Sequence, residues 1–174
     1  MTTEDVVLKE VAPIRVAELT TTASYGSPDI GPAIRSLYPE LFRRLHGAGV
    51  KRADGLAIAY YEDPAEPDDA VTVHAAIPVT AGPHPGYDFA IVDLPAIRPA
   101  ATIIHRGLMG DVTRGLWILA GWIEDNGYRP VGYHREIYLD YDPDEAGQGV
   151  TELQVPVVKD SDRDACDIRI HILY

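Results

Sequence analysis

Cysteine is almost absent from this chain of 174 residues. Its single cysteine, Cys166, excludes an intramolecular disulfide and is typical of a protein from a reducing compartment. No stretch approaches the ~20 apolar residues that cross a bilayer, and the acidic N-terminus lacks the basic and apolar runs of a signal peptide. We therefore expect a cytoplasmic protein with no membrane partner.

Basic residues are also few. Lysine and arginine total 15 against 27 aspartates and glutamates, which gives a formal net charge of -12. Such a charge repels phosphate backbones, so direct nucleic-acid binding is not expected. It attracts cations, and a cleft would concentrate that field, although solubility alone is the simpler explanation of the overall charge.

Motifs for metals, cofactors and common nucleophiles are missing. The six histidines are scattered without metal-ligand spacing, and no glycine-rich phosphate loop or nucleophile elbow occurs. The acidic run at 160–164 lacks the glycine and the terminal glutamate of a calcium loop. The sequence therefore predicts neither a metal site nor a cofactor.

What is present is an internal repeat. An extended segment at 11–17 resembles one at 94–100, and a helix-like stretch follows each of them. The first helix is expected to begin at 27–29 and to be kinked or restarted by Pro39. The second is expected from about 110 to 126. Gly49 and Gly127 are suitable glycines for the two C-terminal caps.

Two strand-like segments follow each helix. The segment 55–61 matches 135–141, and both run into Asp-Pro turns. The last strands end alike at 76–79 and 155–157, and the loop 81–86 joins the halves.

This order predicts an α+β fold made of a duplicated β-α-β-β repeat. We expect a pseudo-twofold object with an antiparallel-rich sheet, helices on one face and a cleft between the repeats. Residues 1–174 would form one domain, divided into a first repeat, a second repeat and a C-terminal extension at about 6–80, 88–158 and 159–174.

The most informative strand is the one at 135–141. Side chains on one face of a strand alternate, so Glu136, Tyr138 and Asp140 are expected to share a face. The matching face of the first half is expected to carry Ala57, Ala59 and Tyr61.

The two small alanines would leave space for a guest, and a cationic guest would stabilise a buried Glu136. Pairing of Glu136 with Arg98 or Arg135, or exposure to water, are the simpler alternatives.

Aromatic residues supply the second expected element of a pocket. Trp117 and Trp122 lie five positions apart, so they point to different sides of their helix. Aromatic faces attract cations by about 0.5–2 kcal/mol. A core position is the simpler role for any single ring, but for the set we expect a pocket wall that includes Trp117, Trp122, Tyr138 and Tyr61.

Taken together, the pattern resembles a known family. The helix end at 121–128 (Gly-Trp-Ile-Glu-Asp-Asn-Gly-Tyr), the strand at 135–139 (Arg-Glu-Ile-Tyr-Leu) and the segment 151–157 (Thr-Glu-Leu-Gln-Val-Pro-Val) are similar to those of GyrI-like proteins. These share their fold with the effector-binding domains of AraC- and MerR-type regulators such as BmrR. The likeness runs from about 6 to 158, and we expect a stand-alone form because no helix-turn-helix segment precedes it.

The resemblance implies a two-repeat pocket for diverse compounds, often aromatic and cationic. It implies that Glu136 matches the buried acidic residue that neutralises a bound cation. Some family members hydrolyse cyclopropane-bearing compounds, which would make Glu136 and Tyr138 catalytic. The sequence thus favours a small-molecule binding protein, with a hydrolase of strained electrophiles and a protein-interaction module such as a gyrase-directed inhibitor as alternatives.

Overall fold

The computed structural model describes residues 5–24, 30–62, 70–141 and 148–161. The chain divides into two compact units. Unit 1 comprises Met1–Val11 and Ile97–Tyr174, and unit 2 comprises Ala12–Ala96.

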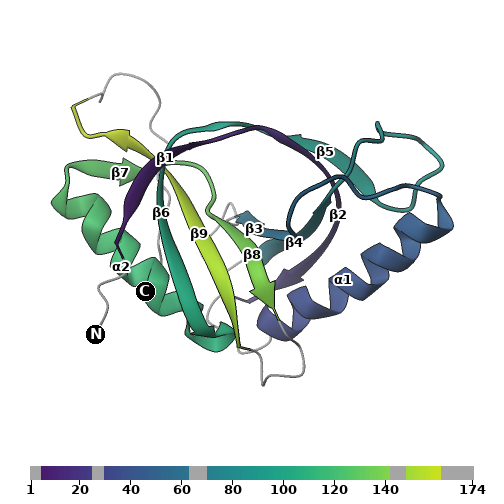
Figure 1. Ribbon diagram of the computed structural model, residues 1–174, viewed down its shortest axis with the longest axis horizontal. Coiled ribbons are helices and arrows are strands. Elements are labelled where there is room, and N and C mark those ends of the chain that lie inside the picture. The colour runs from purple at the N-terminus through teal and green to yellow at the C-terminus, as the bar shows by residue number, and fades with distance from the viewer. Residues whose placement is uncertain (1–4, 25–29, 63–69, 142–147, 162–174) are drawn as a thin grey trace. The chain divides into compact units, whose positions relative to one another are not determined.

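Unit 2 is an antiparallel sheet with one helix (Figure 1). Its strands lie in the order β3-β4-β2-β5. Leu41 and Leu45 of the helix pack against Ala17 and Ile77 of the sheet, which places the apolar core between them. The elements are β2 (Ile14–Ala23), α1 (Ile30–Gly47), β3 (Ile58–Glu62), β4 (Val71–Pro78) and β5 (Ala90–Leu94).

Unit 1 has the same plan. Its strands lie in the order β8-β9-β6-β1, with β7 paired to β9. Leu119 and Ile123 of its helix pack against Ile103 and Leu153. The elements are β1 (Val7–Val11), β6 (Ile97–Leu108), the 3-10 turn η1 (Met109–Asp111), α2 (Val112–Asp125), β7 (Tyr128–Pro130), β8 (Arg135–Tyr141) and β9 (Gln148–Lys159).

The expected α+β class and the duplicated β-α-β-β order are confirmed. The order β2-α1-β3-β4 in unit 2 repeats as β6-α2-β8-β9 in unit 1. The units nevertheless cut across the boundaries expected for the repeats. Strand β1 pairs with β6, and β5 pairs with β2, so each repeat contributes its leading strand to the other unit. The pseudo-twofold relation and the cleft between repeats stay predictions.

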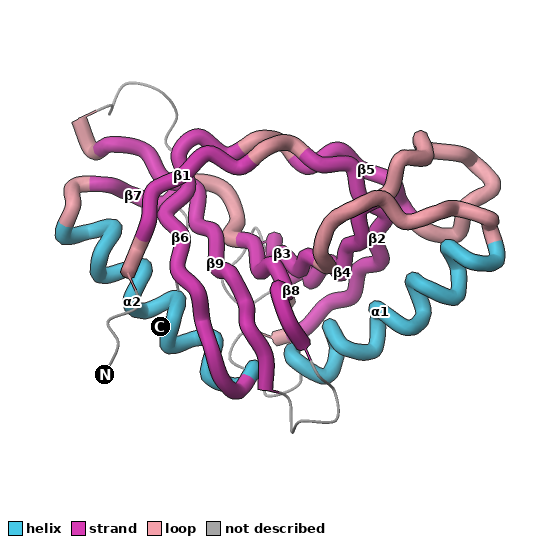
Figure 2. The backbone as a smooth tube through the Cα atoms, in the orientation of Figure 1, coloured by secondary structure: helices cyan, strands magenta, loops and turns pink. Residues whose placement is uncertain are grey.

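Helix α1 does not restart at Pro39, and the kink expected there as the alternative stays a prediction. The helix runs without a restart from Ile30 to Gly47 with Pro39 inside it (Figure 2). Proline removes one backbone donor from a helix, but tertiary packing supplies most helical stability. The buried Leu41 and Leu45 after the proline hold the last turns against the sheet. The expected helix start at 27–29 lies outside the described residues, as do the two Asp-Pro turns.

The two glycine caps are confirmed. Gly49 and Gly127 have φ angles of 69° and 67°, a conformation that favours glycine. After α1, the N–H of Val50 donates to the carbonyl of Leu45 at 2.9 Å, as in a Schellman-type end. Within the described part of the chain, neither helix has the length and apolarity needed to span a bilayer.

Candidate functional site

The buried carboxylate of Glu136 is the centre of the candidate site. Glu136 on β8 lies directly opposite Leu153 on β9, and directly opposed residues of antiparallel strands share a face. Leu153 packs in the core under α2. The register therefore places Glu136 on the helix-covered face of the unit 1 sheet, where it is 6% exposed.

Tyr138 and His134 are among the side chains that approach this carboxylate. The hydroxyl of Tyr138 donates a hydrogen bond of 2.9 Å to Oε2 of Glu136. Nε2 of His134 lies 3.9 Å from Oε1, close enough to interact when the imidazole is protonated. An ionised carboxylate in such surroundings attracts a cation more strongly than the same group in water does. The arrangement suits the binding of a positively charged group.

The arginines considered as partners for Glu136 lie elsewhere. Nε of Arg98 is 3.6 Å from Oε2 of Glu10 at the protein surface. Arg135 lies opposite Gln154, so its side chain leaves β8 on the face away from Glu136. Its guanidinium lies 5.8 Å from the centre of the Tyr133 ring.

One member of the expected face was placed wrongly. A β-bulge interrupts the pairing of β8 with β9 between Tyr138 and Asp140. Tyr138 stays opposite Thr151, whereas Asp140 comes opposite Val150. An extra residue in a strand reverses the alternation beyond it, so Asp140 does not share the face of Glu136 and Tyr138.

The first repeat matches the second with a shift of two residues from the expected alignment. With Pro78 and Pro156 as equivalents, the strand registers align Ala59 with Glu136 and Tyr61 with Tyr138. Both repeats thus carry a tyrosine at one position, while the carboxylate is replaced by alanine.

The three residues predicted from the first repeat lie in the interior of unit 2 or at its margin. Ala59 and Tyr61 are buried on β3. Ala57 precedes that strand and packs against the core under α1.

The two tryptophans separate as their spacing predicts. Trp122 packs against the core of unit 1 and stacks on Tyr128 with ring centres 6.1 Å apart. Trp117 is 57% exposed on the other side of α2. Their roles in a ligand wall stay predictions.

A second buried carboxylate, Glu18 in unit 2, was not anticipated. Glu18 is 6% exposed and lies opposite Ala76 and Ala90 on the sheet face away from α1. The hydroxyl of Tyr60 donates a hydrogen bond to Oε2 of Glu18. Nδ1 of His74 lies 3.4 Å from Oε1 of Glu18.

His74 links Glu18 to a further carboxylate. Its Nε2 lies 3.6 Å from Oε2 of Glu62. Its ring stacks on Tyr60 with centres 4.1 Å apart. The group forms because β2, β4 and β3 are adjacent, a pairing that the linear sequence does not reveal. The available signal was a polar, ionisable residue inside each of two apolar strand segments, at Glu18 and His74.

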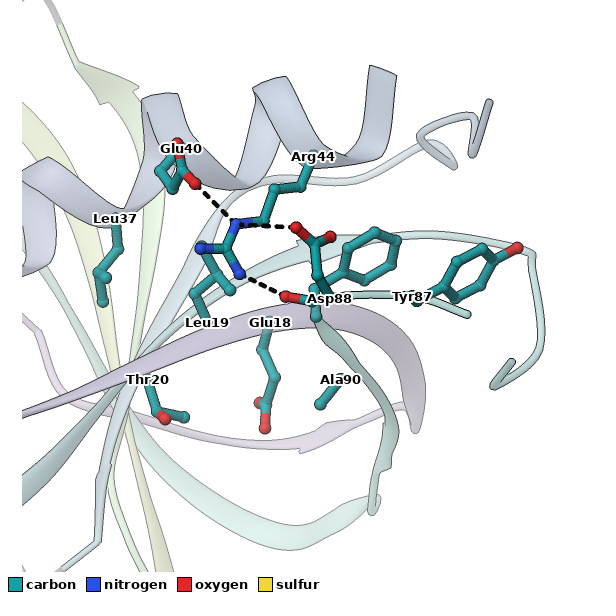
Figure 3. Close-up of a pocket in the computed structure, with 10 residues that line it drawn as sticks. Glu18, Leu19, Thr20, Leu37, Glu40, Arg44, Tyr87, Asp88 and Ala90 are labelled. Carbon is teal, nitrogen blue, oxygen red and sulfur yellow. Dashed lines mark hydrogen bonds and ion pairs between the residues drawn. The ribbon is translucent and has the colours of Figure 1, made fainter. Parts of the chain in front are cut away.

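A surface hollow of about 510 Å³ opens in unit 2 between α1 and the edge of the sheet (Figure 3). Arg44 spans it: its Nε lies 2.7 Å from Glu40 and 3.5 Å from Asp88, and a terminal nitrogen donates to the Asp88 carbonyl. Figure 3 shows Glu18 pointing to the opposite side of β2 from Arg44. The lining residues are Glu18, Leu19, Thr20, Leu37, Glu40, Arg44, Tyr87, Asp88, Phe89 and Ala90.

The ionic contacts on α1 affect the protonation of Glu40. Hydrogen bonds from Arg43 and Arg44 lower the pKa of Glu40 from 4.5 to about 2. Glu40 is therefore ionised near neutral pH and keeps Arg44 in place. Among the residues that the structure describes, no group of three or more histidine, cysteine, aspartate or glutamate side chains could hold a metal ion.

Solved structures of several proteins resemble this chain. The C-terminal domain of EcmrR is 24% identical, with a TM-score of 0.73, and the match covers 91% of this chain and 99% of that one. EcmrR in a complex with DNA is also 24% identical, with a TM-score of 0.76. That match covers 91% of this chain but only 59% of EcmrR.

Two more distant structures share the fold. SAV2435, solved with bound tetraphenylphosphonium, is 13% identical with a TM-score of 0.62, over 88% of this chain and 94% of that one. A hydrolase from Listeria innocua is 14% identical with a TM-score of 0.57, over 89% and 92%.

The family assignment rests on sequence. Among curated proteins, none matches the chain significantly. The GyrI-like small molecule binding domain, in contrast, matches residues 4–158, which include every described helix and all but the last residue of the described strands. This chain therefore belongs to the GyrI-like small-molecule binding domain family.

Proposed function

We propose that this GyrI-like domain binds hydrophobic organic cations that carry aromatic groups, with Glu136 as the residue that compensates their charge. The observation that carries the proposal is the burial of this carboxylate beside the hydroxyl of Tyr138. Burial strengthens the attraction between a carboxylate and a cation. A neutral ligand of similar shape would lack that attraction and should bind more weakly.

Two further observations support this ligand class. The net charge of -12 favours the approach of cations over anions. A protein of the same fold, SAV2435, has been solved with tetraphenylphosphonium, a hydrophobic aromatic cation. Because that protein is only 13% identical, we use its ligand as a probe for this chain.

The direct test is a calorimetric titration of the full chain with two ligands. Tetraphenylphosphonium is the cation, and triphenylphosphine oxide is a neutral compound with similar aromatic groups. We expect the cation to bind at least about tenfold more tightly, equivalent to ~1.4 kcal/mol. Equal affinities would contradict the proposed role of charge.

A hydrolase is the second candidate, and the Tyr138–Glu136 pair favours it. A carboxylate held by a phenol at 2.9 Å is suited to act as a general base. Glu136 would take a proton from water as the water oxygen bonds to a cyclopropane carbon. The breaking ring bond would leave its electron pair on a second carbon, which then receives that proton.

The hydrolase is tested by incubating the chain with a neutral cyclopropane-bearing electrophile and following the ring-opened product. Turnover that falls by about a hundredfold or more in Glu136→Gln, within the usual reach of a general base, would favour catalysis. Tight binding of cations without turnover would favour the binding protein.

A further inference from the structure

The sheet face of unit 2 that lies away from α1 carries a cluster of polar side chains. Glu18 on β2, Tyr60 on β3 and His74 on β4 are each at most 6% exposed. Tyr60 lies directly opposite His74, and His74 lies opposite Thr20, two residues after Glu18, so all of them share this face. Glu62 follows Tyr60 on the same face and is exposed. The cluster therefore extends from a buried carboxylate to one at the surface.

The negative charge of this cluster is not balanced by basic residues. The carboxylates of Glu18 and Glu62 contribute two negative charges, and His74 contributes at most one positive charge. In the described part of the chain, no lysine or arginine forms an ion pair with either carboxylate. Glu40 on α1 differs, because arginines pair with it. A buried carboxylate without full compensation is costly, so a bound cation would stabilise the cluster.

The imidazole of His74 indicates a ligand with hydrogen-bond donors. Both ring nitrogens are buried, and neither makes a hydrogen bond within the residues that the structure describes. Buried polar atoms normally have such partners. Nδ1 lies 3.4 Å from Oε1 of Glu18, so both atoms are within reach of one donor group. An ammonium group has three donors and can donate to this oxygen and to the lone pair of a neutral imidazole at once.

Short side chains leave room beside Glu18. The residues directly opposite it on the two adjoining strands are Ala76 and Ala90. Figure 3 shows Glu18, Thr20 and Ala90 on the side of β2 away from α1. Thr20 and Ala90 are exposed, and both line the surface hollow together with Glu18. A slender group can therefore approach the carboxylate from solvent beside Ala90.

We propose that unit 2 holds a second cation site, which binds the protonated amino group of a small, unbranched primary amine. The ammonium group would donate to Oε1 of Glu18 and to Nδ1 of His74, while the Tyr60 hydroxyl holds the other oxygen of the carboxylate. A hydrophobic phosphonium has no N–H donor, so this site selects a different ligand from the one proposed at Glu136. The site is formed within unit 2 and does not depend on Glu136.

An NMR titration of the full chain with n-butylammonium tests this site. The matched probe is n-butyltrimethylammonium, which has the same alkyl chain and the same charge but no N–H donor. We expect n-butylammonium to shift the imidazole signals of His74 in a saturable way, and the trimethylated probe to bind at least about tenfold more weakly. No saturable shift at His74, or equal affinities of the two probes, would overturn the proposal.

Chain variants locate the binding groups, with affinities measured from the backbone amide signals of β2 and β4. Glu18→Gln removes the charge, and His74→Phe keeps a ring to stack on Tyr60 but removes both nitrogens. Each should weaken n-butylammonium binding by about tenfold or more. Glu10→Gln removes one charge at an exposed position of β1 and should leave binding within about twofold. Melting curves check that the variants are folded, and unchanged binding in both site variants would overturn the proposal.

Two further variants separate this site from the one proposed at Glu136. Glu136→Gln should leave n-butylammonium binding within about twofold, and Glu18→Gln should leave tetraphenylphosphonium binding within about twofold, because each variant alters only one of the two proposed sites. If Glu136→Gln abolishes n-butylammonium binding and Glu18→Gln does not, the amine binds at Glu136. That result overturns the present proposal and leaves the role of Glu136 intact.

A proton on His74 is the alternative occupant of this cluster. The ¹⁵N chemical shifts of the imidazole distinguish a ring with two N–H groups from a neutral ring with one. Under the proposal, a neutral ring should be present when n-butylammonium is bound. A ring that carries two N–H groups both with and without n-butylammonium would show that the imidazolium itself compensates Glu18, which overturns the proposal.

Discussion

The hydrogen bond from Tyr138 to Glu136 has a measurable consequence at the scale of single residues. Tyr138→Phe keeps the ring but removes a donor from a carboxylate that is 6% exposed. A hydrogen bond to a charged group contributes about 1.5–3 kcal/mol. We therefore expect urea unfolding to show a loss of that order for Tyr138→Phe.

The matched control for this variant is Tyr87→Phe. The Tyr87 hydroxyl points away from the other residues that line the surface hollow, as Figure 3 shows. Its removal should change the unfolding free energy by less than about 0.5 kcal/mol, as for most surface changes. If both variants lose the same amount of unfolding free energy, the hydrogen bond from Tyr138 to Glu136 makes no specific contribution to stability.

Glu40 provides a pH prediction at the same scale. Hydrogen bonds from Arg43 and Arg44 lower its pKa from 4.5 to about 2. A carboxylate with a lowered folded-state pKa contributes stability above its unfolded value, and that contribution is lost as the pH falls through the folded value. An NMR titration should show the Glu40 carboxyl protonating near pH 2.

Removal of the donors should restore an ordinary titration. In an Arg43→Ala/Arg44→Ala variant, we expect the midpoint of Glu40 to move up toward 4.5. A midpoint near 4.5 already in the unmodified chain would show that the arginine contacts do not persist in solution.

At the scale of elements, alanine substitution of two glycines in α2 is expected to change the stability of the protein in opposite directions. A Cβ at the buried Gly115 would lie 2.7 Å from Cδ1 of Leu153, whereas a Cβ at Gly121 would meet nothing within 4 Å. Gly115→Ala should cost about 1–3 kcal/mol by overpacking. Gly121→Ala should stabilise the protein by about 0.5–1 kcal/mol, because glycine is a poor helix former.

Thermal or chemical unfolding of the two variants checks the packing of α2 on its sheet. Stabilisation by both alanines would contradict the close approach of Gly115 to Leu153. Destabilisation by both would contradict the exposed position of Gly121.

The helices and strands were largely predictable from sequence, because hydrophobic periodicity and capping residues are local signals. The strand at 135–141 matches β8, and Gly49 and Gly127 end their helices as expected. The restart considered at Pro39 is not found, because the packing of Leu41 and Leu45 behind the proline holds the helix together. Asp140 was misplaced because nothing in the local sequence marks the bulge after Tyr138.

At the scale of the whole molecule, the repeat and the family followed from the order of segments along the chain. The division into units did not, because the pairing of β1 with β6 and of β5 with β2 joins distant segments. The contact between Glu18 and His74 was missed for the same reason, because it joins two strands that are distant in the sequence. The proximity of Glu136 to Tyr138 was predictable because a single strand carries both residues.

The central claim is that Glu136 compensates the charge of a bound cation, and a Glu136→Gln variant tests it most directly. Calorimetric titration with tetraphenylphosphonium should show a dissociation constant raised by about 10- to 100-fold, as expected for a charge contact of ~1.5–3 kcal/mol. Triphenylphosphine oxide should bind unchanged or more tightly, and Glu10→Gln, at an exposed position, should match the unmodified chain. If Glu136→Gln binds the cation as the unmodified chain does, or if both ligands lose affinity equally, the account is contradicted.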